Sequence, residues 1–226
     1  MKHVVFLGLL SAVLTLTGCD LFGPKEAPPK PAKHFEPGYG QSIERPLGTP
    51  FTWPAGLVLL GRPTYDGCVE DPRTEAHWGN GDAVMLCLNL YNTTSQPIKL
   101  DLPPGLMFIS DDNRAQNGLV INLISVEVPP GQHLYVLHSH CANLGRGGSG
   151  PEYTYDPRPV VTQHPQMQDL LRLLATKKIN FEHYGGAYFS PARNFGGTVQ
   201  RAVHRIAEAE TIEPELLREL EALPAR

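Results

Sequence analysis

Short apolar runs separated by proline and glycine turns are the feature that most limits how this chain can fold. Between Gly56 and His140 the runs recur at about the ten-residue spacing that is typical of antiparallel all-β domains. The run from Ala83 to Tyr91 is nearly all apolar, as expected of a strand that is covered on both faces. The predicted strands cover residues 56–61, 83–91, 97–102, 119–128 and 133–140. Together they predict an antiparallel β-sandwich over residues 51–160.

After Pro159 the apolar residues take the i, i+3, i+4, i+7 spacing of amphipathic helices. Three helices are predicted, from Pro165 to Leu174, from a Thr198 cap to about Ala209, and from Pro214 to Leu223. The glycine pairs at 185–186 and 196–197 are expected to bend the chain between helices. Residues 161–226 are therefore expected to form a helical segment packed on or beside the sandwich. The fold class is mainly β with a C-terminal helical segment, and α+β overall.

The N-terminus has the layout of a secretory signal. Lys2 gives it a basic start, residues 4–16 are almost wholly apolar, and small Gly18 precedes a cleavage position. The apolar stretch is too short to cross a bilayer, which needs about 20 residues. The ending Leu16-Thr17-Gly18-Cys19 resembles the lipobox of bacterial lipoproteins. An ordinary secretory signal that is cut nearby is the alternative.

The resemblance implies removal of residues 1–18, attachment of diacylglycerol to the Cys19 thiol, and acylation of the new amine. Several acyl chains on one residue exceed what stable anchoring requires. The lipid bilayer is then the first expected partner, and the covalent lipid on Cys19 is the only expected cofactor. The expected location is the cell membrane, with the protein facing the periplasm or the cell exterior.

Residues 19–50 are expected to form a proline-rich tether. Charged residues lie between the prolines, and such a segment buries too little apolar surface to offset the entropy cost of folding. Proline favours the extended polyproline II conformation, which would hold the domain away from the membrane. The alternative is that residues 35–50 fold onto the domain through Phe35, Tyr39 or Phe51.

Three cysteines remain once Cys19 is acylated: Cys68, Cys87 and Cys141. An odd number allows at most one disulfide within the chain, and the compartment beyond the membrane favours its formation. Cys68 is expected to pair with either of the other two.

His138 and His140 lie two residues apart on a predicted strand, so their side chains are expected to share a face. Two such histidines can hold Zn²⁺ or Cu²⁺ if a third ligand joins them. That ligand would come from His133, His164 or His183. The alternative is a polar end of a strand that leaves the core.

The segment Val199-Gln200-Arg201-Ala202-Val203-His204 is similar to the glutamine-containing helical motif of thioester domains in bacterial surface adhesins. Those domains carry an upstream cysteine, for which Cys141 is the candidate here. The resemblance implies an internal thioester between Cys141 and Gln200 that captures amines on a host surface without a cofactor. Two features depart from the family: His204 stands where an aromatic residue is usual, and the spacing is short. The alternative is a polar edge on an amphipathic helix.

Other function classes lack their signatures. The net charge of −4 at pH 7 argues against nucleic-acid binding, which usually needs a basic patch. The sequence has no phosphate-binding loop, no His-Glu-x-x-His and no Gly-x-Ser-x-Gly motif. We therefore expect a non-enzymatic, membrane-anchored envelope lipoprotein whose sandwich binds or scaffolds an unknown envelope or surface partner. A thioester adhesin and a histidine-based metal-binding protein are the alternatives.

Overall fold

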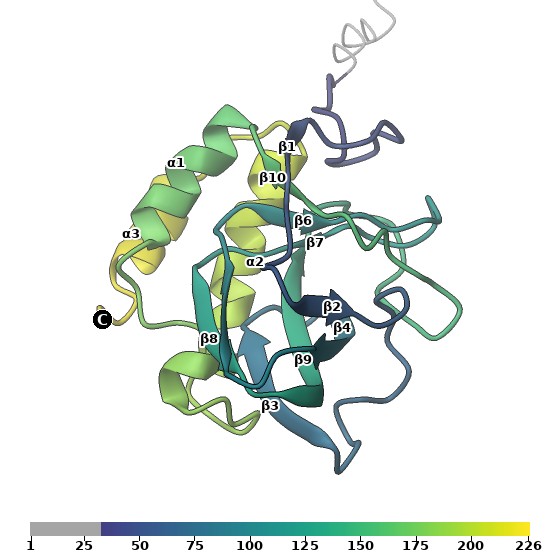
Figure 1. Ribbon diagram of the computed structural model, residues 1–226. Helices are drawn as coiled ribbons and strands as arrows, with labels where there is room; N and C mark the ends of the chain where they lie inside the picture. Colours follow the sequence, from purple (N-terminus) through teal and green to yellow (C-terminus); the bar gives the residue numbers. More distant parts are fainter. Residues whose placement is uncertain (1–32) are drawn as a thin grey trace, which may run out of the picture. The chain divides into compact units, whose positions relative to one another are not determined.

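One long strand, β9 (Gly131–Cys141), organises the fold, because it pairs with β3, β4 and β7. Figure 1 shows the arrangement in a computed structural model that describes residues 33–226. The signal sequence, Cys19 and the first part of the expected tether lie outside the described residues. Residues Lys33–Arg226 form one compact unit, and no helix among them is long and apolar enough to cross a membrane.

The described strands form an eight-stranded sheet in the order β1-β10-β6-β7-β9-β4-β2, with β3 beside β9, and a separate β5-β8 pair. Their bounds are β1 Gly48–Pro50, β2 Leu57–Leu59, β3 Thr74–Gly79, β4 Val84–Asn92, β5 Ile98–Leu102, β6 Leu106–Phe108, β7 Gly118–Leu119, β8 Ile124–Val128 and β10 Val160–Thr162. The β3–β9 pairing is parallel, and the other pairings between these strands are antiparallel. About 30% of the described residues are in strands and 19% are in helices, so the expected mainly β, α+β class is confirmed.

Strand β4 is covered on both faces, as its apolar run predicts. Leu86, Leu88 and Leu90 are fully buried in the larger strand core, which also contains Trp78. Cys87 packs on the opposite side with Val136 of β9. The long β4–β9 ladder therefore lies at the centre of the domain, with buried side chains on both of its faces.

Of the two disulfide pairings left open by the sequence, the structure has Cys68–Cys87, and Cys141 is a buried free thiol. The bridge ties the loop before β3 to the middle of β4, across a separation of 19 residues. It therefore holds the loop before β3 against β4.

The helices lie together on one side of the sheet (Figure 1). They are α1 (Pro165–Leu174), the short 3₁₀ helix η1 (Phe181–Tyr184), α2 (Arg193–Ala207) and α3 (Pro214–Glu221). The first and third α-helices begin at the predicted prolines. Met167, Leu170, Leu171 and Leu174 form the buried stripe of α1, as the spacing predicts.

The predicted start of the second helix is wrong. Helix α2 begins at Arg193, so Thr198 lies inside it, and Gly196-Gly197 do not bend the chain. A Cβ atom at Gly196 would lie 2.3 Å from the carbonyl oxygen of Asn80. Gly196 therefore serves close packing of helix against loop, a role that overrides its poor helix propensity.

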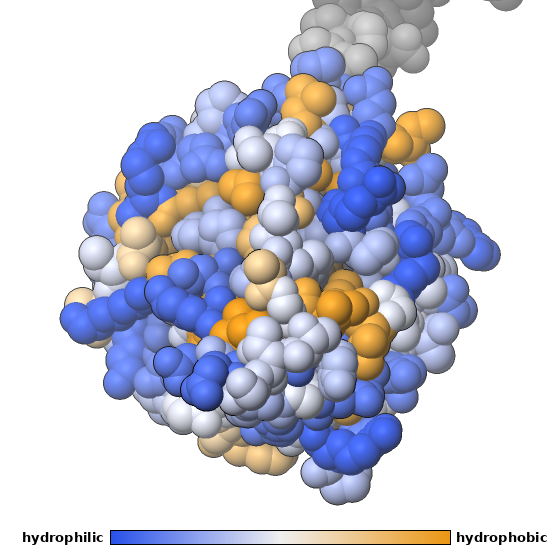
Figure 2. Space-filling view, viewed as in Figure 1, coloured by the Kyte–Doolittle hydropathy of each residue, from blue (hydrophilic) through white to orange (hydrophobic). Residues whose placement is uncertain are grey.

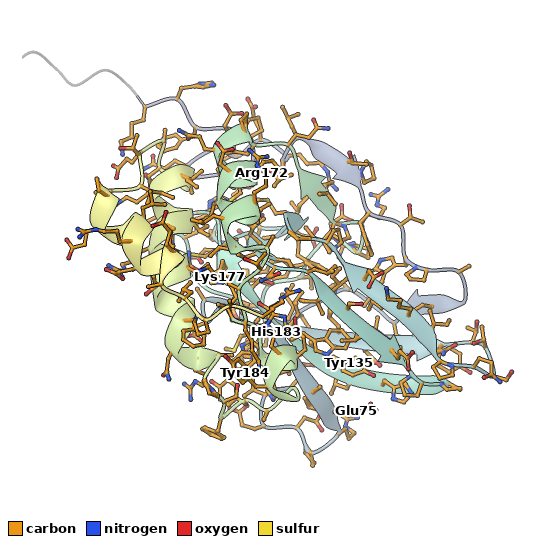
Figure 3. The ribbon with its side chains drawn as sticks, turned by 90° about the vertical axis from the view of Figure 1, so that its left-hand side faces the viewer. Glu75, Tyr135, Arg172, Lys177, His183 and Tyr184 are labelled. Atoms are coloured by element: carbon orange, nitrogen blue, oxygen red, sulfur yellow. A yellow bond between two sulfur atoms is a disulfide. The ribbon has the colours of Figure 1, made fainter. Side chains whose placement is uncertain are left out.

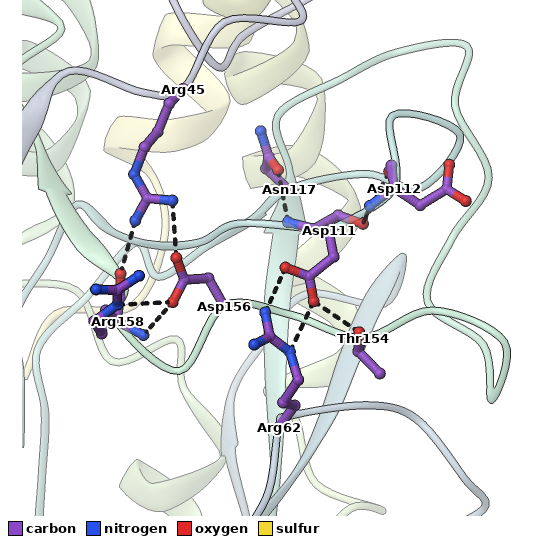
Figure 4. A network of polar contacts seen from close by, with 9 residues as sticks. Arg45, Arg62, Asp111, Asp112, Asn117, Thr154, Asp156 and Arg158 are labelled. Carbon is purple, nitrogen blue, oxygen red and sulfur yellow. Dashed lines mark hydrogen bonds and ion pairs between the residues drawn. The ribbon is translucent and has the colours of Figure 1, made fainter.

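The expected tether ends earlier than Pro50. Tyr39 is 1% exposed, its hydroxyl donates to Thr162 Oγ1 at 2.7 Å, and β1 pairs with β10. Figure 4 shows Arg45, which donates to Asp156 Oδ2 at 2.8 Å and to the Arg158 carbonyl oxygen at 3.1 Å. Residues 33–50 thus belong to the folded body, because a buried tyrosine and these hydrogen bonds offset the entropy cost of ordering the proline-rich chain.

The sandwich and the helical segment share one core. Strand β10 spans the expected boundary at residue 160, and its Val160 belongs to the same hydrophobic core as Val199 and Val203 of α2. The face of the molecule drawn in Figure 2 is mostly hydrophilic, with apolar residues in separate groups between polar ones. The described residues therefore form a single body rather than a sandwich with a detachable appendage.

Replacing both Cys68 and Cys87 with alanine should lower the free energy of unfolding by about 3 kcal/mol, because the unfolded chain regains the entropy of an open loop. Urea denaturation under non-reducing conditions measures the change. A reductant should destabilise the wild type but leave the double variant unaffected. Equal midpoints for the wild type with and without reductant would contradict the bridge.

Candidate functional site

Cys141 and Gln200 meet at the end of β9, although 59 residues separate them in the chain. The Cys141 backbone N–H donates to Gln200 Oε1 at 2.9 Å, and Gln200 Nε2 donates to the Cys141 carbonyl oxygen at 2.9 Å. The glutamine side chain therefore pairs with the strand backbone as a neighbouring strand would. Cys141 is 1% exposed, so the contact lies inside the protein.

His204 completes the cluster one helical turn beyond Gln200. Its Nε2 lies 2.6 Å from Cys141 Sγ, while its side chain is half-buried and reaches an open groove. Burial raises the pKa of the Cys141 thiol to about 12 and lowers the pKa of His204. The resting pair at pH 7 is therefore a neutral thiol beside a neutral imidazole.

Helix α2 brings these groups to β9 through one face. Gly196, Gln200 and His204 follow one another at four-residue intervals, which places them above one another on the helix. Gly196 lies against Asn80, and Val199 and Val203 are fully buried beside this face. The close contact at Gly196 and the apolar packing together set how near Gln200 and His204 come to the strand.

His140 is also a neighbour of Gln200. Its Nε2 is 2.9 Å from Asn80 Oδ1, so the neutral ring donates to the amide oxygen. Burial lowers the pKa of His140 to about 3, and the neighbouring Gln200 side chain partly offsets this effect. Asn80 thus contacts both Gly196 and His140, and links the loop after β3 to the cysteine-glutamine cluster.

His138 is engaged elsewhere. Its Nδ1 lies 3.1 Å from the Gly81 carbonyl oxygen and its Nε2 lies 2.9 Å from His77 Nδ1. The carbonyl oxygen fixes the proton on Nδ1, which leaves Nε2 to accept from His77. Burial is the main cause that lowers the pKa of His138 to about 3.

The structure does not gather the three ligands of the predicted metal site. His133 contacts Glu75, which also accepts from Tyr135 at 3.3 Å (Figure 3), and His183 Nδ1 accepts from the Asn180 backbone. His164 caps α1, where its Nδ1 accepts from the Met167 N–H. Among residues 33–226 the one compact set of possible ligand atoms comes from Asp66, Cys68 and Cys87, and its two sulfur atoms are joined in the disulfide. Metal binding by His138 and His140 stays a prediction.

A groove of about 810 Å³ opens beside His204. Leu144 and Leu216 line part of it, and the other residues that line it, apart from His204, are charged. Five of these are glutamates and three are basic: Glu208, Glu210, Glu213, Glu215, Glu219, Lys33, Arg201 and Arg205. The groove is therefore rich in acidic residues, and it leads from solvent to the His204 imidazole, which contacts the buried Cys141 thiol.

No family model, no curated protein and no solved structure matches this chain. The geometry of the site is therefore the basis on which a function can be proposed. Sequence reasoning proposed Cys141 and Gln200, and it treated His204 as a departure from the adhesin motif. It missed Asn80 and Gly196. The recurring four-residue step from Gly196 to His204 is the signal that could have found the full helix face.

The free energy of unfolding should fall as the pH drops below 6.5. His138 and His140 bind protons in this range when the chain is unfolded but stay neutral when they are buried in the folded protein. A pKa lowered from 6.5 to about 3 leaves this stability intact above pH 6.5 and costs about 2 kcal/mol per residue at pH 5. His140→Gln should flatten the slope in urea titrations between pH 7 and pH 5. His133→Gln is the matched control, since the hydrogen bond that His133 donates to Glu75 raises the pKa of His133. Loss of this histidine therefore cannot flatten the slope. An unchanged slope in His140→Gln would contradict the assignment.

Proposed function

We propose that this chain is a membrane-anchored envelope lipoprotein that captures amine-bearing partners covalently, through a thioester between Cys141 and Gln200. The observation that carries the proposal is the paired hydrogen bonding of the Gln200 amide to the Cys141 backbone. The resemblance to the adhesin motif suggested Cys141 and Gln200 as a pair. Their contact across 59 residues supports the pairing independently of that resemblance. The broader expectation of a non-enzymatic binding protein is retained, with binding that ends in a covalent bond.

Formation of the bond needs no cofactor. Cys141 Sγ attacks the Gln200 Cδ carbon, a C–S bond forms, and the C–N bond of the amide breaks. The thiol proton leaves with the amide nitrogen, so one ammonia is released. His204, 2.6 Å from Sγ, is close enough to carry that proton.

The surroundings suit a stored acyl group. Cys141 is 1% exposed and Gln200 is only partly exposed, so water has little access to the bond between them. A thioester is an activated acyl group, and a water-excluding site prevents its hydrolysis. Burial therefore preserves the bond until an amine reaches it.

A thiol hydrolase is less consistent with the same residues. Catalytic cysteines have lowered pKa values and partial exposure, because the thiolate is the nucleophile. Cys141 has a pKa raised to about 12 by burial and almost no exposure. These properties favour one slow internal acylation over repeated attack on external substrates.

The proposed lipid anchor would localise the capture reaction to the membrane surface. Acyl chains on Cys19 would hold the chain in the membrane, and the proline-rich residues between Cys19 and the folded body would carry that body outward. A covalent bond to an amine on another molecule would then link that molecule to the membrane. The partner class is thus an envelope or surface molecule with accessible primary amines.

Methylamine should add once to the protein and release one free thiol. The full chain, purified in detergent from its own membranes, is treated with methylamine and studied by intact mass spectrometry and thiol titration. The untreated protein should be lighter than its sequence and lipid predict by one ammonia. After treatment and unfolding in a non-reducing denaturant, Cys141 should react with a thiol reagent, while Cys68 and Cys87 stay protected in their disulfide.

Cys141→Ala and Gln200→Ala should each abolish both the ammonia deficit and the methylamine adduct. Gln132→Ala is the matched control, since that glutamine lies on β9 and bonds Asn89 instead. A wild-type protein with no deficit and a titratable Cys141 thiol before treatment would reject the thioester.

Cys19→Ser should move the protein from the membrane to the soluble fraction, because serine lacks the thiol that accepts diacylglycerol. Detergent phase partitioning of cells that express either version measures the change. Wild type in the aqueous phase, without acyl mass, would reject the anchor and leave the thioester proposal untouched.

A further inference from the structure

We propose that His204 is a catalytic residue of the capture reaction, and that the groove it lines admits a cationic primary amine such as a lysine side chain. The inference rests on the proposed Cys141–Gln200 thioester and names its substrate class and proton carrier. The imidazole of His204 lies between the buried sulfur of Cys141 and the acidic groove.

His204 is the group through which the groove reaches the sulfur. Its Nε2 lies 2.6 Å from Cys141 Sγ, and its side chain lines the groove of about 810 Å³. Cys141 is 1% exposed and does not line the groove. An amine that enters the groove therefore meets the imidazole beside the bond it must attack.

The groove favours a positive charge. Lys33 and Arg205 each pair with Glu210 at 2.6 Å, Arg205 also pairs with Glu213 at 2.7 Å, and Arg201 pairs with Glu219. These ion pairs use all three basic residues of the groove.

Glu208 and Glu215 have no ion pair within residues 33–226, and the buried Oε1 of Glu208 has no hydrogen-bond partner there. An unpaired carboxylate oxygen that is out of water is costly, so a bound ammonium group would stabilise it. The two spare carboxylates thus select cationic amines over neutral or anionic ones.

The reaction balances with His204 as the proton carrier. The bound ammonium group first loses one proton to solvent. The free-base amine nitrogen then attacks Gln200 Cδ, a C–N bond forms, and the C–S bond to Cys141 breaks. His204 Nε2 accepts a proton from the attacking nitrogen and delivers it to the departing sulfur. The products are a substituted Gln200 amide and the Cys141 thiol, and His204 returns to its neutral form.

The charge state of His204 suits this role. Burial lowers its pKa, so the ring is neutral and able to accept a proton at pH 7. The groups that face it are Cys141 on β9, buried His140 behind it, and the eight charged residues of the groove. A neutral imidazole next to Sγ can act as base and then as acid within one transfer.

His204→Phe separates catalysis from packing. Phenylalanine keeps a ring in the space beside Cys141, and aromatic residues are usual at this position in the adhesin motif. The full-length variant should retain the ammonia deficit, because the thioester still forms, yet release its thiol about 10²–10⁴-fold more slowly in methylamine. The wild-type rate should also fall as His204 becomes protonated at acidic pH, after correction for the free-base fraction of methylamine.

Equal rates in His204→Phe and wild type would overturn the catalytic role. If His204→Phe lacks the deficit, the corrected wild-type pH profile decides instead. A flat profile would then overturn the role, and a fall at acidic pH would support it. Absence of the deficit in the wild type rejects the thioester itself, which is a distinct result.

The groove is tested with cadaverine, a dication, against methylamine. Glu208→Gln with Glu215→Gln should slow thiol release by cadaverine several-fold more than release by methylamine, and Glu127→Gln on β8 is the control outside the groove. An unchanged cadaverine-to-methylamine ratio would overturn the selection of cationic amines.

Discussion

The contact between helix α2 and the end of β9 is the constraint on which the candidate site depends. The helix can come this close because Gly196 has no side chain where the Asn80 carbonyl oxygen lies against it. Four and eight residues later, Gln200 and His204 reach the backbone and the sulfur of Cys141. A bulkier residue at position 196 would force the helix away and separate all three groups, so one glycine serves the fold and the chemistry together.

Desolvation sets both the protonation states and the water access of the site. The burial that raises the pKa of Cys141 and lowers that of His204 also excludes water from the proposed acyl bond. A neutral thiol beside an amide suits a bond that forms once, and a half-buried imidazole suits its later release to an amine. The proposed lipid on Cys19 would hold this thioester at the membrane. The thioester reacts only once, so a stable covalent bond to the partner matters more than a fast reaction rate.

Local patterns predicted the elements whose stability is local. Pro165 and the apolar stripe after it gave α1, and the apolar run of residues 83–91 gave a strand buried on both faces. Expectations failed where packing overrides propensity. Gly196 reads as a bend in isolation but lies inside α2. The proline-rich residues 33–50 fold because Tyr39 is buried, which is the alternative that the sequence left open beside an extended tether.

The features of the candidate site also fall into those that the sequence predicted and those that only the tertiary structure decided. The sequence by itself determined which side chains are available, and the motif around Gln200 was enough to suggest Cys141 as its partner. Only the tertiary structure decided that the two are in contact, that Cys68 bonds Cys87 and leaves Cys141 free, and that His204 lies against the sulfur. The physical reason is distance along the chain: propensity and periodicity act within a few turns, whereas a contact across 59 residues is set by how a helix packs on a sheet.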